Sequence, residues 1–165
     1  MVIIIFGVSG AGKTTIGKLL ARDLRWRFIE ADDFHPAANI EKMRSGHPLT
    51  DNDRWPWLEQ LRQQIERSLS ARENAVLACS ALKRAYRDRL HVSDEIKFVF
   101  LRGDHALVEK QLRSRHGHFM NAALLQSQFH DLEEPESDEN VQTVDLGRKP
   151  QELVDEIKAT LHFAD

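Results

Sequence analysis

The chain has 165 residues, 41% of them hydrophobic, which is enough for the core of one domain spanning 1–165. Its formal net charge is −3 with both signs intermixed, so a broad nucleic-acid or membrane surface is excluded. The single cysteine, Cys79, excludes an internal disulfide and favours a reducing, cytoplasmic compartment.

The first predicted strand, Val2–Phe6, runs directly into a phosphate-binding motif. Gly7-Val-Ser-Gly-Ala-Gly-Lys-Thr14 fits G-x-x-x-x-G-K-[ST], and a helix is predicted over Thr15–Leu24. Backbone N–H groups of such a loop, with the positive end of the helix, bind the phosphates of a nucleoside triphosphate. Lys13 would reach the β- and γ-phosphates, and the Thr14 hydroxyl would bind Mg²⁺. The predicted nucleotide-binding residues are Gly7, Val8, Ser9, Gly10, Ala11, Gly12, Lys13, Thr14 and Thr15.

Strands and helices alternate along the rest of the chain. Further strands are predicted at Arg27–Glu30, Ala75–Cys79, Ile96–Leu101 and Val141–Asp145. Helices are predicted to begin at Pro36 and Pro56 and to span Ser80–Leu90, Asp104–Arg115, 121–132 and Pro150–Leu161. This alternation predicts an α/β fold, a five-stranded parallel sheet with helices on both faces. Ligands of such sheets bind where the strands end, which makes those segments the candidate site.

Carboxylates follow the second strand at Glu30, Asp32 and Asp33. Phosphoryl transfer needs a group that accepts the proton of the attacking hydroxyl, and Asp32 is the favoured candidate. Either aspartate could instead cap the helix that begins at Pro36. Glu30 could hold Mg²⁺ through water. Asp104, after the fourth strand, is interpreted as a helix cap.

Cations follow the third strand and indicate an anionic acceptor. Lys83 and Arg87 share a helix face at a spacing of four, and Arg54 is a further candidate clamp for a carboxylate or phosphate. Arg84 and Arg89 are interpreted as solvated surface residues. Cys79 is interpreted as a core residue at a strand end. Trp55 and Trp57 would either wall the substrate pocket or pack in the core.

Arg115-His-Gly-His118 interrupts two predicted helices and is interpreted as the hinge of a lid over about 113–135. A closing lid would bring Arg115 to the phosphates and exclude water, and the alternative is an ordinary helix–helix turn. His116 and His118 lack a third ligand at a convincing spacing, so no metal site is expected there.

A phosphate loop alone does not separate kinases from GTPases or ATPases. The guanine-reading Asn-Lys-x-Asp tetrapeptide is absent, and the chain is too small for a motor with partner domains. A small kinase of a metabolite fits best.

The motifs together resemble the small gluconate kinases over nearly the whole chain, from residue 2 to about 160. The segments that carry the resemblance, beside the phosphate loop, are Asp32-Asp-Phe-His-Pro36, Asn39-Ile-Glu-Lys-Met43, Pro48-Leu-Thr-Asp-Asn-Asp-Arg-Trp-Pro-Trp-Leu58, Cys79-Ser-Ala-Leu-Lys83, Tyr86-Arg-Asp88, Gly117-His-Phe-Met120, Leu125-Gln-Ser-Gln-Phe129 and Leu132-Glu-Glu-Pro135. Ala31 stands where members often have glycine before the first aspartate.

The resemblance implies a nucleoside-monophosphate-kinase-like fold with a mobile lid, commonly a homodimer, using ATP and Mg²⁺ to phosphorylate the 6-hydroxyl of D-gluconate. It implies that Asp32 faces that hydroxyl. His35, Arg54, Lys83 and Arg87 would surround the sugar acid, with Arg115 and His118 in the lid. Two alternatives stay open: a kinase of another small anion, such as shikimate, idonate or a nucleoside monophosphate, and a regulatory module without catalysis.

Overall fold

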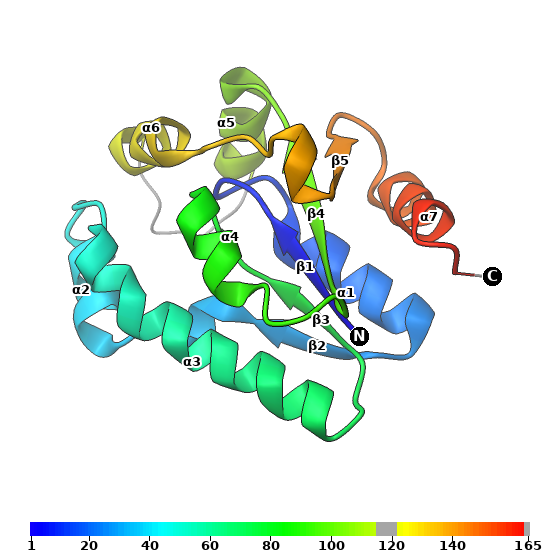
Figure 1. Cartoon of the computed structure of the whole chain (residues 1–165). Coiled ribbons are helices and arrows are strands. Elements are labelled where there is room, and N and C mark those ends of the chain that lie inside the picture. Colours follow the sequence, from blue (N-terminus) through cyan, green and yellow to red (C-terminus); the bar gives the residue numbers. More distant parts are fainter. Residues whose placement is uncertain (115–121, 164–165) are drawn as a thin grey trace.

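The computed structural model describes residues 1–114 and 122–163, which form a central five-stranded parallel sheet with helices on both faces (Figure 1). The strands are β1 (Val2–Phe6), β2 (Arg27–Glu30), β3 (Ala75–Ala78), β4 (Ile96–Arg102) and β5 (Val141–Asp145). The α-helices are α1 (Lys13–Leu24), α2 (Ala37–Arg44), α3 (Asp51–Ser70), α4 (Arg84–Leu90), α5 (His105–Arg113), α6 (Ala122–Asp131) and α7 (Pro150–Thr160). Short 3₁₀ helices, η1 (Ala31–Phe34) and η2 (Ser137–Glu139), follow β2 and precede β5. The predicted fold class is confirmed.

The sheet order is β2-β3-β1-β4-β5, which places β1 and its phosphate loop at the centre. Val2 pairs with Ala75 on one side and with Ile96 on the other, so all three strands run in phase toward the same edge. All five residues of β1 are fully buried, as expected for a central parallel strand. The polar segments after the strands therefore meet at one edge of the sheet.

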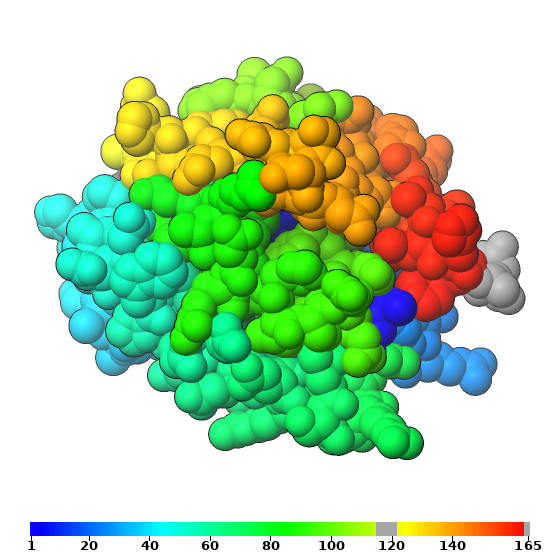
Figure 2. Space-filling view, viewed as in Figure 1, coloured from blue at the N-terminus to red at the C-terminus, as the bar shows by residue number. Residues whose placement is uncertain are grey.

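Two hydrophobic layers cover the faces of the sheet because successive side chains of β1 alternate between them. Val2, Ile4 and Phe6 pack with α3 and α4, where Trp57 and Tyr86 are the largest buried side chains. The other layer joins Ile3 and Ile5 to side chains of α1 and α7. Figure 2 shows α4 on one face next to the segment that leads into β5. Among the described residues, no helix is both long and apolar enough to cross a bilayer.

The predicted start of α3 at Pro56 is wrong, since the helix begins at Asp51. Thr50 Oγ1 accepts a hydrogen bond from the Asp53 backbone N–H at 3.2 Å, and Asp53 Oδ2 accepts one from the Thr50 N–H at 2.8 Å. This capping box satisfies two N–H groups that a helix start leaves unpaired, and Pro56 is accommodated inside the helix. The earlier start brings Arg54 into the helix.

The helix predicted over Ser80–Leu90 is also shorter than expected, because α4 begins only at Arg84. Ala81 has a φ of +37°, which no residue in a right-handed helix adopts, so residues 79–83 form a loop. The interpretations of Asp104 and Cys79 are confirmed. Asp104 Oδ1 accepts from Leu107 N at 2.8 Å as a helix cap, and burial raises the pKa of the Cys79 thiol to about 12.

Candidate active site

The phosphate loop joins β1 to α1 and depends on glycine at two positions. Gly10 has a φ of +83°, and a Cβ there would lie 2.4 Å from Leu112 Cγ of α5. Gly7 has a φ of +151°, with its Cβ position 3.0 Å from the Leu101 carbonyl oxygen. A larger residue would displace either the loop or the chain packed against it. Lys13 Nζ donates to Val8 O at 2.9 Å, which holds the ammonium group inside the loop.

Thr14 and Glu30 form an oxygen pair at the start of α1. Thr14 Oγ1 donates to Glu30 Oε2 at 2.5 Å. Burial raises the pKa of the Glu30 carboxyl, and the Thr14 hydrogen bond opposes that shift. The two residues that the sequence analysis named for magnesium therefore lie in direct contact.

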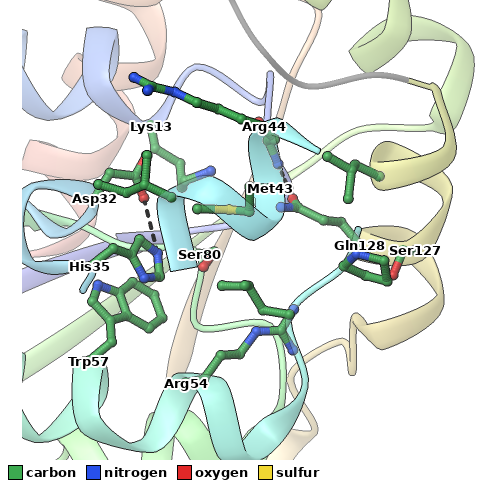
Figure 3. Close-up of a pocket in the computed structure, with 15 residues that line it drawn as sticks. Lys13, Asp32, His35, Met43, Arg44, Arg54, Trp57, Ser80, Ser127 and Gln128 are labelled. Carbon is green, nitrogen blue, oxygen red and sulfur yellow. Dashed lines mark hydrogen bonds and ion pairs between the residues drawn. The ribbon is translucent and has the colours of Figure 1, made fainter. Parts of the chain in front are cut away.

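A cavity of about 280 Å³ opens beside the loop (Figure 3). Ser9 and Lys13 line its phosphate side, and Asp32, His35 and Arg54 line the rest together with Trp57, Ser80 and Gln128. These residues come from the phosphate loop and the start of α1, from η1 and its flank, and from α3, α6 and the loop after β3. The structure thus brings the predicted lysine, aspartate, histidine and buried arginine to one cavity.

His35 is held in one orientation on the cavity wall. Its ring stacks on Trp57 at 4.2 Å between centroids and 14° between planes. Trp57 Nε1 in turn donates to Ala31 O at 2.7 Å, which ties η1 to α3. Trp57 is therefore both a core residue and part of the cavity wall, whereas Trp55 is 39% exposed and does not line the cavity.

The amide of Asn39 selects the tautomer of His35. Asn39 Nδ2 donates to Asp53 O at 2.9 Å and lies 3.3 Å from His35 Nδ1, which accepts its second hydrogen. The ring proton is then on Nε2, which lies 3.9 Å from Asp32 Oδ1. Burial lowers the pKa of His35, the Arg54 charge lowers it further and Asp32 opposes the shift, so the ring is neutral near pH 7.

Arg54, three residues before Trp57 in α3, also lines the cavity and has only 8% of its surface exposed. Its Nη1 donates to Tyr86 Oη at 2.9 Å and to Asp131 Oδ2 at 3.1 Å. Asp131 ends α6, and Gln128 of the same helix accepts from the Ser9 N–H at 2.6 Å through Oε1. Helix α6 therefore contacts both the phosphate loop and the arginine.

The structure does not bring Lys83 to the cavity. Its Nζ donates to Asp51 Oδ1 at 2.9 Å, outside the lining residues. This ion pair raises the pKa of Lys83, and the Tyr86 and Lys83 contacts lower the pKa of Asp51. The structure therefore places Lys83 against Asp51, and direct contact of Lys83 with the acceptor stays a prediction.

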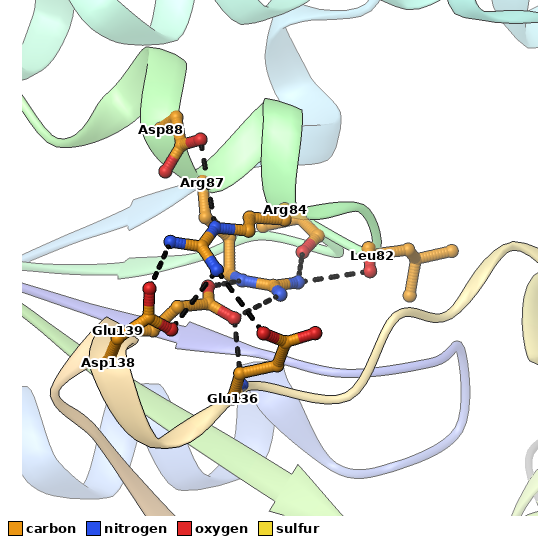
Figure 4. Close-up of polar contacts among 8 residues, drawn as sticks. Leu82, Arg84, Arg87, Asp88, Glu136, Asp138 and Glu139 are labelled. Atoms are coloured by element: carbon orange, nitrogen blue, oxygen red, sulfur yellow. Dashed lines mark hydrogen bonds and ion pairs between the residues drawn. The ribbon is translucent and has the colours of Figure 1, made fainter.

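Arg87 lies in another polar cluster (Figure 4). The prediction that it contacts the acceptor is corrected, because its donors are engaged there. Its Nε and Nη2 donate to Glu139 at 2.8 and 3.1 Å, while Nη1 donates to Ala81 O and Leu82 O at 3.1 and 3.0 Å. The guanidinium is 5.0 Å from the centre of the Phe6 ring and the residue is 2% exposed. With these donors engaged, Arg87 ties the segment before β5 to α4. Arg84, which pairs with Asp138 at the surface, agrees with its predicted surface role.

Two predicted lid residues, Arg115 and His118, lie outside the described residues.

The prediction from sequence also missed three residues that contribute to the site. Asn39, Tyr86 and Gln128 stood in quoted motifs without a role, because their task depends on neighbours distant in sequence. A second cavity of about 230 Å³ lies beside Gly12 and Thr15 and is lined by Gln111, Gly147 and Arg148, among others. Its position after β5 is the signal that could have found it.

A five-stranded parallel sheet with a phosphate loop after its central strand and an acceptor-sized cavity beside that loop defines a small P-loop kinase. Residues 2–135 match the family model described as an AAA domain. The chain is 47% identical over 137 residues to the thermosensitive gluconokinase of Escherichia coli, covering 82% of this chain and 73% of the relative. It is 44% identical over 156 residues to the gluconokinase of Gluconobacter oxydans, covering 94% and 88%.

A crystal structure of a gluconokinase from Sinorhizobium meliloti superposes with a TM-score of 0.87 at 42% identity, covering 97% of this chain and 90% of that one. The chain belongs to the gluconokinase family. The family resemblance that the sequence motifs predicted is confirmed.

Proposed function

We propose that this protein is a gluconokinase, which transfers the γ-phosphoryl group of ATP to the 6-hydroxyl of D-gluconate. The observation that carries the proposal is the cavity of about 280 Å³, which joins the phosphate loop to a carboxylate, a neutral histidine and a buried arginine. Transfer of a phosphoryl group to a polyhydroxy acid requires these functional groups around one cavity.

On the nucleotide side, residues Gly7–Thr15 would bind the phosphates of ATP, with Lys13 turning from Val8 O to the β- and γ-phosphates. The second cavity beside Thr15 has the position for the nucleoside. The Thr14 hydroxyl would bind Mg²⁺ directly and Glu30, its hydrogen-bond partner, would hold the ion through water, as suits a cation that prefers oxygen ligands and keeps several waters. When bound, Mg²⁺ neutralises charge on the transferring phosphoryl group.

On the acceptor side, Asp32 lines the cavity and Asp33 is not among its lining residues, which supports Asp32 as the acceptor of the hydroxyl proton. His35 Nε2–H faces the same space and would donate to a sugar oxygen. Arg54 would bind the carboxylate of the acid. Its Nε and Nη2 make no hydrogen bond within the described part of the chain, so the side-on edge of the guanidinium is open for a bidentate contact.

Three further proposals complete this function. Residues 1–165 act as one kinase domain in which the segment 113–135 is the lid and Arg115 and His118 belong to it. The protein is cytoplasmic, supported by its single, buried thiol. It is a homodimer, as the family resemblance implies.

The test is ATP-dependent ADP release with a panel of acceptors: D-gluconate, idonate, shikimate and nucleoside monophosphates. We expect turnover with gluconate and a product whose phosphate is on the 6-oxygen by ³¹P NMR. Lys13→Ala is the matched control for contaminating kinases. Turnover with another member of the panel and none with gluconate would reject the proposed substrate, and no turnover with any would favour a regulatory module.

A further inference from the structure

A chain of polar contacts runs from the surface to Arg54 and includes Tyr86, a residue to which no role in the site has been assigned so far. Lys83 Nζ donates to Asp51 Oδ1 at 2.9 Å, the Tyr86 hydroxyl donates to the same Asp51 oxygen, and Arg54 Nη1 donates to Tyr86 Oη at 2.9 Å. Tyr86 is 1% exposed, so its hydroxyl has no access to bulk water as a substitute partner.

The direction of each hydrogen bond in this chain is fixed by chemistry. A guanidinium can only donate and an ionised carboxylate can only accept, so the single hydroxyl proton of Tyr86 must point to Asp51. The oxygen lone pair is then left for Arg54. Burial together with the Asp51 hydrogen bond raises the pKa of Tyr86, which keeps that proton on the phenol. A negative charge on Asp51 polarises the phenol and strengthens its oxygen as an acceptor.

The contacts of Arg54 fix the plane of its guanidinium. Both hydrogens of Nη1 are used, one toward Tyr86 and one toward Asp131, and the Tyr86 ring lies 5.4 Å from Arg54 Cζ. The opposite edge, Nε with Nη2, has no hydrogen-bond partner in the described segments. Arg54 lines the cavity (Figure 3), and we infer that this edge is the one available to an acceptor, since it carries the donors that remain.

We propose that Tyr86 is a positioning residue for the sugar acid: held by the Lys83–Asp51 ion pair, its hydroxyl sets Arg54 for bidentate binding of the acceptor carboxylate. The proposal rests on the proposed function, since Arg54 must bind that carboxylate. It also gives Lys83 an indirect part in acceptor binding, through Asp51 and Tyr86.

The first variant is Tyr86→Phe, which removes the hydroxyl and keeps the ring against Trp55 and Arg54. We expect the KM for gluconate to rise about tenfold, with kcat and the KM for ATP within about twofold. The reason is that only the orientation of the Arg54 guanidinium is lost. A merely structural tyrosine would instead change all three parameters together with the thermal midpoint. Arg84→Gln, on the same helix in a surface pair with Asp138, is the matched control and should change none of them.

A double-mutant cycle with Arg54→Ala tests whether Tyr86 acts through the arginine. In the Arg54→Ala background, Tyr86→Phe should have no further effect on the KM for gluconate. An equal tenfold rise in both backgrounds would overturn the proposal, as would an unchanged KM in the single variant.

Lys83→Met distinguishes the indirect action of Lys83 through Asp51 and Tyr86, here called the relay, from direct contact of Lys83 with the acceptor. The relay predicts a rise in the gluconate KM of about twofold to fourfold, smaller than that of Tyr86→Phe, because the ion pair is exposed and one step further away. A larger effect of Lys83→Met would place the lysine on the acceptor and overturn the relay. Failure of the proposed function would be visible in the wild-type protein, whereas failure of the relay would be visible only in the variants.

Discussion

The two sides of the cavity are built in different ways. The nucleotide side is a continuous stretch, Gly7–Thr15, whose ligands are mostly backbone N–H groups and whose shape follows from glycine conformations. The acceptor side is assembled from side chains on separate segments: Asp32 in η1, His35 directly after it and Arg54 in α3. The nucleotide side therefore depends mainly on residues within one motif, whereas the acceptor side depends on how α2, α3, α4 and α6 pack.

The largest expected effect comes from the local side. Lys13→Ala should lower kcat by at least about 10³-fold for every acceptor, because the charge that stabilises the transferring phosphoryl group is lost. Steady-state kinetics with saturating gluconate and ATP measure this. A loss confined to the KM for gluconate would contradict the division between the two sides.

Asp32→Asn should lower kcat by about 10²–10⁴-fold with little change in either KM, because the variant retains the shape of the side chain but accepts the hydroxyl proton poorly. Asp33→Asn is the matched control and should retain near wild-type kcat. A loss below threefold for Asp32→Asn would remove its role as the base.

Arg54→Ala should raise the KM for gluconate by about 10- to 100-fold, the range expected for losing a charged hydrogen-bonded clamp. The KM for ATP should stay within about threefold. Initial-rate measurements with each substrate varied in turn would distinguish the two, and a selective loss of ATP affinity would place Arg54 on the wrong side of the cavity.

The smallest effect concerns pH and stability. The pKa of His35 is lowered in the fold by burial, so the unfolded chain binds more protons than the native one below its ordinary pKa of about 6.5. The contribution of His35 to stability is thus present above that pH and is lost as the pH falls toward the lowered value. Urea unfolding from pH 8 to pH 5 should show a steeper loss for the wild type than for His35→Gln, and parallel curves would contradict this assignment.

The sequence alone determined the sheet, the phosphate loop and the family. Short apolar strands can be predicted because strands buried on both faces need continuous apolar runs. The loop can be predicted because its glycines and lysine lie within one short motif. It also put Asp32, His35 and Arg54 into the acceptor set, and the structure brings these three to one cavity.

Only the tertiary structure decided which cations reach that cavity. Lys83 and Arg87 carry the same positive charge as Arg54, but Lys83 is paired with Asp51, and Arg87 is used by Glu139 and two backbone carbonyls. Their carboxylate partners lie about 30 to 50 residues away in sequence, so no local spacing reveals them. A cation can bind a ligand in the cavity only where the fold places it at the cavity with donors to spare, as it does for Arg54, and that placement is a property of packing rather than of composition.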